Sequence, residues 1–348
     1  MAEVLRYVNT AAAAGGDGTT PNATDSGDGT RAYSTLSEWE SNEGTNLVTD
    51  GDTHRVVCTG GADSTYVVLN GFTTGSSNTC TIEGEWDPAT CRFDSTKYNV
   101  ARTTANQIDI QQSWTIFDKM QFDGSGTANH GPFIQGAVAE SDITYKNSVF
   151  YDFARTGAWQ RLNATNTKYE NNLFYNLGWG CVGTDGTSTN RGTLYNCTGY
   201  DYNTANNAGG SFTHQNANGQ WKVVNCIGIA SSSSTRGDFE AVYTLATGSD
   251  YNASSDTTAP GANSIHSITD STEFKSVTGG SENFHLSAGS TLRGDGVGPS
   301  SDSDVPTTDV DGDTRSGTTC DIGFDEYVAV GGGLSIPIAM YHYRHHHR

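Results

Sequence analysis

Residues 146–152 read Lys146-Asn-Ser-Val-Phe-Tyr-Asp152, and three later stretches are near-copies of this motif. They read Glu170-Asn-Asn-Leu-Phe-Tyr-Asn176, Tyr195-Asn-Cys-Thr-Gly-Tyr-Asp201 and Val224-Asn-Cys-Ile-Gly-Ile-Ala230. With one further asparagine they give a series spaced by 24, 25, 29 and 27 residues: Asn147, Asn171, Asn196, Asn225 and Asn252. A period in the twenties with loop insertions of variable length is typical of a solenoid.

The repeated unit is too short for a helical repeat, and its apolar residues alternate as they do in strands. One parity should face water: Lys146, Lys168, Glu170 and Lys222. The other should face inward: Tyr145, Tyr169, Leu194 and Val223. The five asparagines are assigned to the inward parity. Stacked about 4.8 Å apart, they would form a structural ladder of hydrogen-bonded amides.

These motifs resemble the right-handed parallel β-helix proteins of the pectate-lyase-like type, which carry asparagine ladders and side-chain stacks at this position. The resemblance covers most of the chain and implies an all-β fold, a single-stranded right-handed parallel β-helix. It says little about chemistry, because the same scaffold occurs in lyases, hydrolases, adhesins and bacteriophage virion surface proteins.

Four regions are expected along the 348 residues. Residues 1–57 should form an N-terminal cap region with a short helix, because Thr35 and Glu38 make a capping box and Leu36 with Trp39 gives an apolar edge. Residues 58–273 should form the β-helix. Residues 274–330 resemble a C-terminal closing segment, and residues 331–348 are interpreted as a docking arm hinged on three glycines.

Composition excludes several classes of partner. The net charge of −20 repels nucleic acid and anionic membranes, and no run of 18 apolar residues is present to span a bilayer. The first ten residues lack the apolar core of a secretory signal. We therefore expect assembly in a bacterial cytoplasm and release on virus particles.

The seven cysteines form no CxxC pair, and the histidines are not spaced to complete a zinc site with them. Cys197 and Cys226 directly follow ladder asparagines and should stack as thiols on adjacent coils. For Cys80 and Cys91, which are 11 residues apart, a disulfide and two free thiols are both open. No cofactor is expected, with calcium as the exception considered next.

Alternate carboxylates at Asp309, Asp311 and Asp313 could converge on calcium, or could cap a turn that bonds Arg315. Gly312 is misplaced for an EF-hand loop, which favours the turn. The arm is apolar and then basic, in a chain that is otherwise acidic. We expect it to dock on another subunit through Leu334, Ile336, Ile338, Met340, Tyr341, Tyr343, Arg344 and Arg348. The alternative is a disordered end.

Glycoside hydrolysis needs two carboxylates roughly 5–9 Å apart. The available acids are Asp152, Asp185, Asp201, Asp238 and Glu240, and none lies in a motif of the polygalacturonase-like families. Asp152 and Asp201 share one repeat position and are interpreted as turn residues. Arg155 and Arg161 are only loosely placed for a lyase, and His214 is interpreted as a loop residue. No catalytic residue is therefore assigned.

The preferred hypothesis is a non-enzymatic bacteriophage virion protein, a capsid decoration or fibre-like subunit that contacts other virion proteins through the arm. It would form a homo-oligomer, with a trimer as one option, and could bind a cell-surface glycan through Trp159 and Trp179. The alternative is a tailspike-like polysaccharide lyase or hydrolase, or a glycan-binding protein, on the same scaffold.

Overall fold

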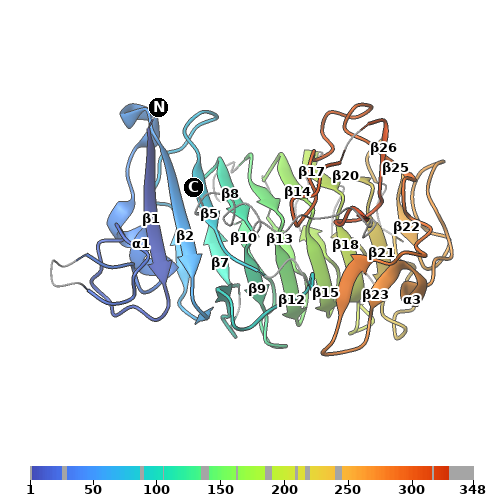
Figure 1. Ribbon diagram of the computed structural model, residues 1–348, viewed down its shortest axis with the longest axis horizontal. Coiled ribbons are helices and arrows are strands. Elements are labelled where there is room, and N and C mark those ends of the chain that lie inside the picture. The colour runs from blue at the N-terminus through green and yellow to red at the C-terminus, as the bar shows by residue number, and fades with distance from the viewer. Residues whose placement is uncertain are drawn as a thin grey trace, which may run out of the picture.

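The chain winds into a column of stacked coils whose parallel strands form three sheets, as the computed structural model shows in Figure 1. The structure describes residues 2–25, 30–86, 90–104, 106–134, 141–161, 164–184, 190–207, 211–215, 220–239, 245–315 and 317–328. Within these ranges, six successive coils each contribute a strand to all three sheets. The predicted all-β parallel β-helix is confirmed.

The first sheet contains β1 (Glu3–Asn9), β2 (Thr53–Thr59), β5 (Cys80–Glu83), β8 (Thr115–Asp118), β11 (Thr144–Lys146), β14 (Thr167–Glu170), β17 (Asn190–Tyr195) and β20 (Gln220–Val224). The second contains β3 (Ala62–Asp63), β6 (Asn99–Val100), β9 (Gln121–Asp123), β12 (Val149–Phe153), β15 (Leu173–Leu177), β18 (Thr198–Tyr202), β21 (Ile227–Ala230) and β22 (Ala253–Ser254). The third contains β4 (Val67–Leu69), β7 (Ile108–Ile110), β10 (Phe133–Ile134), β13 (Ala158–Gln160), β16 (Val182–Thr184) and β19 (Thr213–Gln215).

Aromatic side chains stack inside the column at the spacing of the strands. Tyr145 lies 4.9 Å from Phe117 and 4.9 Å from Tyr169, with ring planes within 10° of parallel. A second stack places Phe150 between Phe122 at 4.9 Å and Phe174 at 4.5 Å. Neighbouring strands are themselves about 4.8 Å apart, so in-register pairing produces these stacks directly.

The predicted helix, α1 (Leu36–Glu43), covers the N-terminal end of the column, and a short helix, α2 (Leu47–Asp50), follows it in the chain. Thr35 accepts from the Glu38 amide, and Glu38 accepts in turn from the Ser34 amide. Leu36 and Trp39 are buried against the first coils. The cap thereby removes the apolar end of the solenoid from water.

The first sheet is buried on its inner face and, at its C-terminal end only, also on its outer face, where Tyr195 and Val224 pack with Val305 and Cys320. The second sheet is buried on both faces from β12 to β21. Its outer face carries Val149, Leu173 and Ile227, which are fully buried together with residues from the C-terminal part of the chain. That part, residues 270–328 without 316, is called the C-terminal flap below. It contains α3 (Asp270–Glu273) and two antiparallel hairpins, formed by β23 (Phe274–Ser276) with β24 (Asn283–Leu286) and by β25 (Gly296–Val297) with β26 (Thr319–Cys320).

The C-terminal flap lies along the side of the column, and the expectation that residues 274–330 form a closing segment stays a prediction. Figure 1 shows this orange and red segment beside β14 to β22. Its apolar side chains that pack on the second sheet are Phe274, Phe284, Leu286, Leu292, Val310, Ile322 and Phe324. The flap therefore encloses a second core outside the column.

The asparagine column docks this flap. Asn147, Asn171, Asn196 and Asn225 occupy equivalent turns between the first and second sheets, all with positive φ near 50°. Asn171 donates to Asn147 and Asn225 donates to Asn196, over 3.2 and 3.3 Å. Their amides also donate to flap carbonyls, at Thr308 from Asn171, at Asp321 and Gly323 from Asn196, and at Val297 from Asn225.

Two details of the predicted ladder were wrong. The amides turn toward the flap and not into the column, because the positive φ of the turn directs the side chain outward. Asn252 belongs to the next, inward-facing position, where its Oδ1 accepts from the Cys226 amide at 2.9 Å. Asn172 does the same for Ser148, and the positive-φ position of the last coil is taken by Tyr251.

Replacing Asn196 with alanine should lower the free energy of unfolding by about 2–4 kcal/mol, because buried carbonyls lose their donor and alanine is strained at positive φ. Chemical denaturation measures this loss. Asn196→Gly should recover about 1 kcal/mol of it, since glycine tolerates that φ. Asn147→Ala is the matched control, in the same conformation but without a bond to the flap. Equal losses at the two asparagines would contradict the docking role.

Candidate functional site

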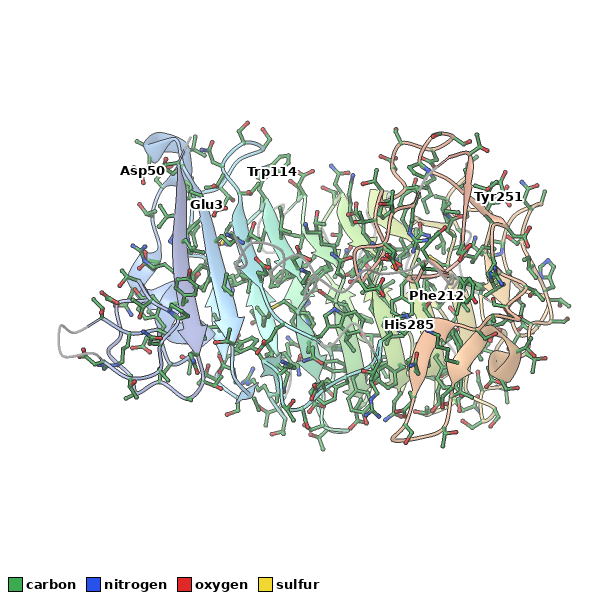
Figure 2. All side chains as sticks on the ribbon, in the orientation of Figure 1. Glu3, Asp50, Trp114, Phe212, Tyr251 and His285 are labelled. Atoms are coloured by element: carbon green, nitrogen blue, oxygen red, sulfur yellow. The ribbon has the colours of Figure 1, made fainter. Side chains whose placement is uncertain are left out.

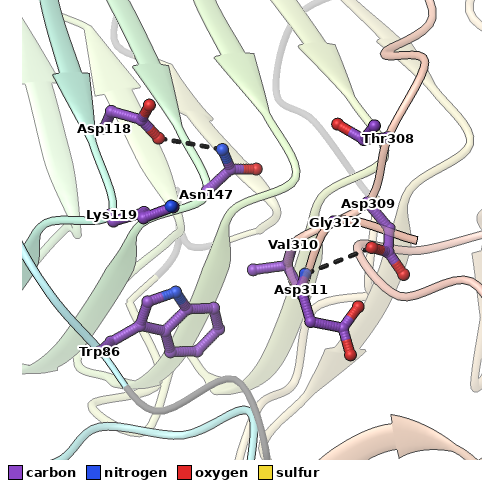
Figure 3. A pocket seen from close by; sticks show the side chains of 9 residues that line it. All are labelled: Trp86, Asp118, Lys119, Asn147, Thr308, Asp309, Val310, Asp311 and Gly312. Atoms are coloured by element: carbon purple, nitrogen blue, oxygen red, sulfur yellow. Dashed lines mark hydrogen bonds between the residues drawn. The ribbon is translucent and has the colours of Figure 1, made fainter. Parts of the chain in front are cut away.

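A cleft of about 280 Å³ opens where the C-terminal flap meets the column. Figure 3 shows Trp86, Asp118, Lys119 and Asn147 on the column side. The flap side is formed by residues 308–312. Carboxylates, an ammonium group, an amide and an indole thus line one opening, a combination that suits a polar ligand with some apolar surface.

The column wall of the cleft is held by contacts between adjacent coils. Asp118 accepts from the Asn147 amide at 2.9 Å, and its other oxygen lies 3.1 Å from the Lys146 ammonium. Lys119 occupies the same positive-φ turn position as the asparagines, one coil earlier. At this turn position, the coil beyond the edge of the flap has a lysine, whereas the coils that the flap covers have asparagines.

The flap wall is a turn organised by Asp309. Its Oδ1 accepts from the Asp311 and Asp313 amides at 3.2 and 2.7 Å, and its Oδ2 accepts from the Glu326 amide at 2.8 Å. Burial and the neighbouring Asp311 raise the pKa of Asp309 to about 7. The predicted turn cap is thus the role in which the structure uses Asp309.

Arg315 was expected to hydrogen-bond this turn, but its side chain bonds other groups. Its guanidinium is buried, forms an ion pair with Glu326 at 2.7 Å, and donates to the carbonyls of Asp321 and Gly323. The carboxylates of Asp309, Asp311 and Asp313 lie within 4.8 Å of one another. Because both Asp309 oxygens already accept amide protons, calcium binding stays a prediction.

Trp159 and Trp179, the predicted glycan-binding pair, are brought together around His130. The His130 ring centroid lies 4.6 Å from that of Trp159 and 6.1 Å from that of Trp179. Arg155 stacks 4.6 Å above the Trp179 ring. Trp159 is buried and its indole leans over Gly183, whereas Trp179 is half-exposed. Trp179 is therefore the face of this cluster that a sugar ring could stack on.

The acids considered for catalysis have structural roles where they are described. Asp152 and Asp201 occupy equivalent positive-φ positions inside β12 and β18 and not turns, which corrects the expectation, and Asn176 between them donates to Asp152 at 2.7 Å. Asp238 is buried and accepts from Ala230 and Ser255. Arg161 lies 5.7 Å from the Phe133 ring. Asp185, Glu240 and the His214 side chain lie outside the described residues.

Asp238 gives the fold a pH dependence with a definite sign. Burial raises the pKa of Asp238 to about 6. Between its unfolded pKa near 4 and this value, the folded state holds a proton that the unfolded state releases, so stability falls as pH rises through that window. In metal-free buffer, we expect Tm to decrease from about pH 4.5 to about pH 6.5.

Ser255→Ala should steepen this decrease, because the Ser255 hydroxyl bonds the ionised form of Asp238 over 2.7 Å. Ser233→Ala, at an exposed position, is the control and should leave the slope unchanged. Differential scanning calorimetry across the range measures both. A Tm that rises over the same range in the wild type would contradict this assignment.

All seven cysteines are buried thiols outside any disulfide, so the disulfide between Cys80 and Cys91 is not formed. Cys197 and Cys226 stack on adjacent coils as expected, with the Cys197 amide 3.4 Å from the Cys226 sulfur. Cys80 lies in the column core, whereas Cys91 lies in the second core under the flap. The second sheet therefore separates the two thiols.

Sequence reasoning missed a group that forms beside the cleft. Cys91, His285 and Asp325 come together there, with Cys91 Sγ 3.3 Å from His285 Nε2 and His285 Nδ1 2.8 Å from Asp325 Oδ1. Although burial opposes it, the hydrogen bond to Asp325 raises the pKa of His285. By their spacing, the histidines were expected not to complete a zinc site with the cysteines, and that expectation stays a prediction. Only the docking of the flap brings these three residues together, and spacing along the chain carries no signal of it.

The predicted docking residues of the arm, from Leu334 to Arg348, lie outside the described residues. In the part of the chain that is described, no helix has the length and apolar character needed to cross a membrane.

Comparisons with known proteins find no matching family model and no matching curated protein. Among solved structures, the chain is similar to the crystal structure of the pectate lyase Pel9A, with a TM-score of 0.36 and 12% sequence identity. The alignment covers 93% of this chain and 96% of that one. The likeness concerns the fold alone, and the strand pairing described above establishes the parallel β-helix independently.

Proposed function

We propose that this chain is a non-enzymatic structural protein on the surface of a bacteriophage virion, a capsid decoration or fibre-like subunit anchored by residues 334–348. The observation that carries the proposal is that the described body already covers its own apolar surfaces. The flap covers the second sheet and α1 covers the N-terminal end of the column. Such a body can project into solvent without a partner.

The distribution of apolar and charged residues supports attachment through the arm. Among the described residues, the exposed large apolar side chains are Val48, Tyr66 and Val328, from three separate parts of the chain. Contiguous apolar patches mark interfaces, and three scattered residues do not make one. The arm begins just after Val328, is apolar over residues 334–340, and ends with arginines and histidines but no acid.

An acidic body with a basic arm also favours self-association. The net charge of −20 makes the body of a neighbouring copy an electrostatic partner for Arg344 and Arg348. We therefore include a homo-oligomer, with a trimer as one option, in the proposal. Other virion proteins with acidic surfaces would present the same chemistry to the arm.

The test is incorporation into particles of the phage that encodes the chain. We expect Ile336→Asp combined with Ile338→Asp to abolish incorporation, because charge prevents burial of the arm's apolar face. Ser335→Asp combined with Ala339→Asp adds the same charge at residues that are not predicted anchors, and should retain most incorporation. Circular dichroism should show an intact column in both variants. Normal incorporation of the isoleucine variant would contradict the proposal.

A second candidate, recognition of a cell-surface glycan, is favoured by the cluster of Trp159, Trp179, His130 and Arg155. We expect Trp179→Ala to weaken binding to polysaccharide from the host by about five- to thirtyfold, since one stacked sugar ring contributes about 1–2 kcal/mol. Trp114→Ala is the control, because Trp114 is also half-exposed but lies outside the cluster. Equal binding by both variants would remove this candidate.

The enzymatic alternative rests on the cleft, where Asp309 with its raised pKa faces Asp118 and Lys119. A carboxyl that titrates near neutrality is suited to general acid catalysis. It predicts release of reducing sugar or unsaturated uronide from host polysaccharide, and loss of that release in Asp118→Asn. Wild-type protein that binds but does not cleave would exclude it.

A further inference from the structure

Three segments that are distant in sequence meet at one point of the flap interface. Cys91 follows β5 and belongs to the column side, and His285 lies in β24 of the flap. Asp325 comes 40 residues after His285, and Cys91 comes 194 residues before His285. Figure 2 shows His285 on the flap, in front of the column. One polar cluster thus joins the outer coils to both parts of the flap.

The cluster is buried, and its groups are the ones that transition metals prefer. Cys91, His285 and Asp325 are 0%, 7% and 3% exposed, and one ligand atom from each lies within 4.8 Å of the others. Thiolate, imidazole and carboxylate together favour zinc, whereas calcium takes oxygen ligands only. A buried set of this kind inside an otherwise apolar core is costly without a function.

The charges around the cluster call for a cation. Asp311 Oδ2 lies 4.0 Å from His285 Nδ1, and Asp311 and Asp309 belong to the acidic turn described above. Asp325 Oδ2 accepts from the Leu286 amide at 2.7 Å, which holds Oδ1 toward the imidazole. Asp325, Asp311 and Asp309 act electrostatically on the Cys91 thiol against a single lysine, Lys275, so a divalent ion would balance the surplus of negative charge.

We propose that Cys91, His285 and Asp325 bind a zinc ion, with Asp311 or a water molecule as fourth ligand, and that this ion fastens the flap to the column. Tetrahedral zinc separates sulfur and nitrogen ligands by about 3.5 Å, and nitrogen and oxygen ligands by about 3.3 Å. The sulfur lies 3.3 and 3.5 Å from the two imidazole nitrogens. With zinc on Nδ1, the Asp325 oxygen, now 2.8 Å from Nδ1, must withdraw by about half an ångström. The imidazole must also turn so that Nδ1 points between the sulfur and the carboxylate, because the sulfur now lies beside both ring nitrogens.

Nucleophilic catalysis by the same three groups is the competing interpretation, since Cys, His and Asp occur in that order in thiol hydrolases. The Cys91 thiol is fully buried in the second core, so a substrate cannot reach it without removal of the flap. A metal ion needs far less room. Asp311 is exposed and lines the cleft, which provides a path from solvent to the cluster.

Cobalt substitution of the full-length, metal-free protein tests the proposal. We expect one Co²⁺ to produce a thiolate-to-metal charge-transfer band in the near ultraviolet together with visible bands typical of tetrahedral coordination. Residues 329–348 contain four histidines and no cysteine, so metal bound by the tail cannot produce the thiolate band. Absence of that band in wild-type protein overturns the proposal without reference to any variant.

Cys91→Ser should abolish the band, and Cys320→Ser should leave it unchanged. Cys320 is the matched control because it is also a buried thiol at the flap interface, where it bonds the Val297 carbonyl at 3.1 Å. Zinc should also raise Tm of the wild type by about 4 °C at one hundred times Kd. Cys91→Ser should lose this increment. A band that survives in Cys91→Ser, or a zinc effect on Tm equal in both proteins, overturns the assignment.

Discussion

Phe150→Ala is expected to lower the free energy of unfolding by about 3–5 kcal/mol, because it removes the middle ring of an internal stack. Phe150 is fully buried and lies between Phe122 at 4.9 Å and Phe174 at 4.5 Å. The coils on either side are held by in-register strand pairing and cannot collapse into the space. Urea denaturation followed by circular dichroism measures the loss.

Tyr151→Ala is the matched control, one residue along the same strand. Tyr151 points to the opposite face of the second sheet, where it is half-exposed and stacks on Phe93 at 4.9 Å. Its loss should cost no more than about 2 kcal/mol. If Tyr151→Ala were the more destabilising of the two, Phe150 would not lie inside a column.

Phe284→Ala should have an effect of similar size, about 3–5 kcal/mol, but on the attachment of the flap. Phe284 is fully buried, with its ring 5.1 Å from that of Tyr175 and 5.2 Å from that of Tyr200 on the second sheet. It also meets Phe274 edge-on at 5.5 Å. Removal of this ring leaves the flap without its central contact while the column stack stays complete.

This loss of attachment should appear as proteolytic cleavage that is confined to the flap. Limited proteolysis followed by mass spectrometry should cut Phe284→Ala between residues 270 and 328, and leave fragments that contain the column intact. Tyr327→Ala is the control, because Tyr327 is half-exposed and packs under Arg293. A single cooperative transition with no early cleavage in the flap would show that flap and column unfold as one unit.

The column could be predicted from the sequence because its repeat consists of a short motif that returns at a nearly regular spacing. One motif returns every 24–29 residues, and the alternation of Lys146 with Tyr145 assigns the two faces of the first sheet. Capping chemistry is equally local, so Thr35 and Glu38 predicted α1 correctly. Features that depend on neighbours within a few residues, or on exact repetition, were accessible without a structure.

The side-on flap was missed although a signal for it was present. Val149 directly precedes Phe150, and Leu173 directly precedes Phe174, so both faces of these strands are apolar. Consecutive apolar residues indicate a strand buried on both sides, and the column interior accounts for only one side. The error with Asn252 has a related cause, since an asparagine suits both the outward turn position and the inward position after it.

Candidate site residues divide in the same way. The role of Asp309 as a turn cap follows from its own short motif and was predicted. Trp159 and Trp179 lie on adjacent coils, and the repeat alone brings them near each other. Cys91, His285 and Asp325 meet only because the flap folds back over the column, and no local pattern records that tertiary contact.

Zero-length carbodiimide cross-linking tests the central claim most directly, namely that stacked coils carry the flap along their side. Within the column, Lys146 lies 3.1 Å from Asp118 on the adjacent coil. Between column and flap, Lys222 lies 3.5 Å from Asp302. We predict both amide links in the monomer by peptide mass spectrometry. Recovery of the Lys146–Asp118 link, with the acids of the flap joined to no lysine of the column, would contradict the account.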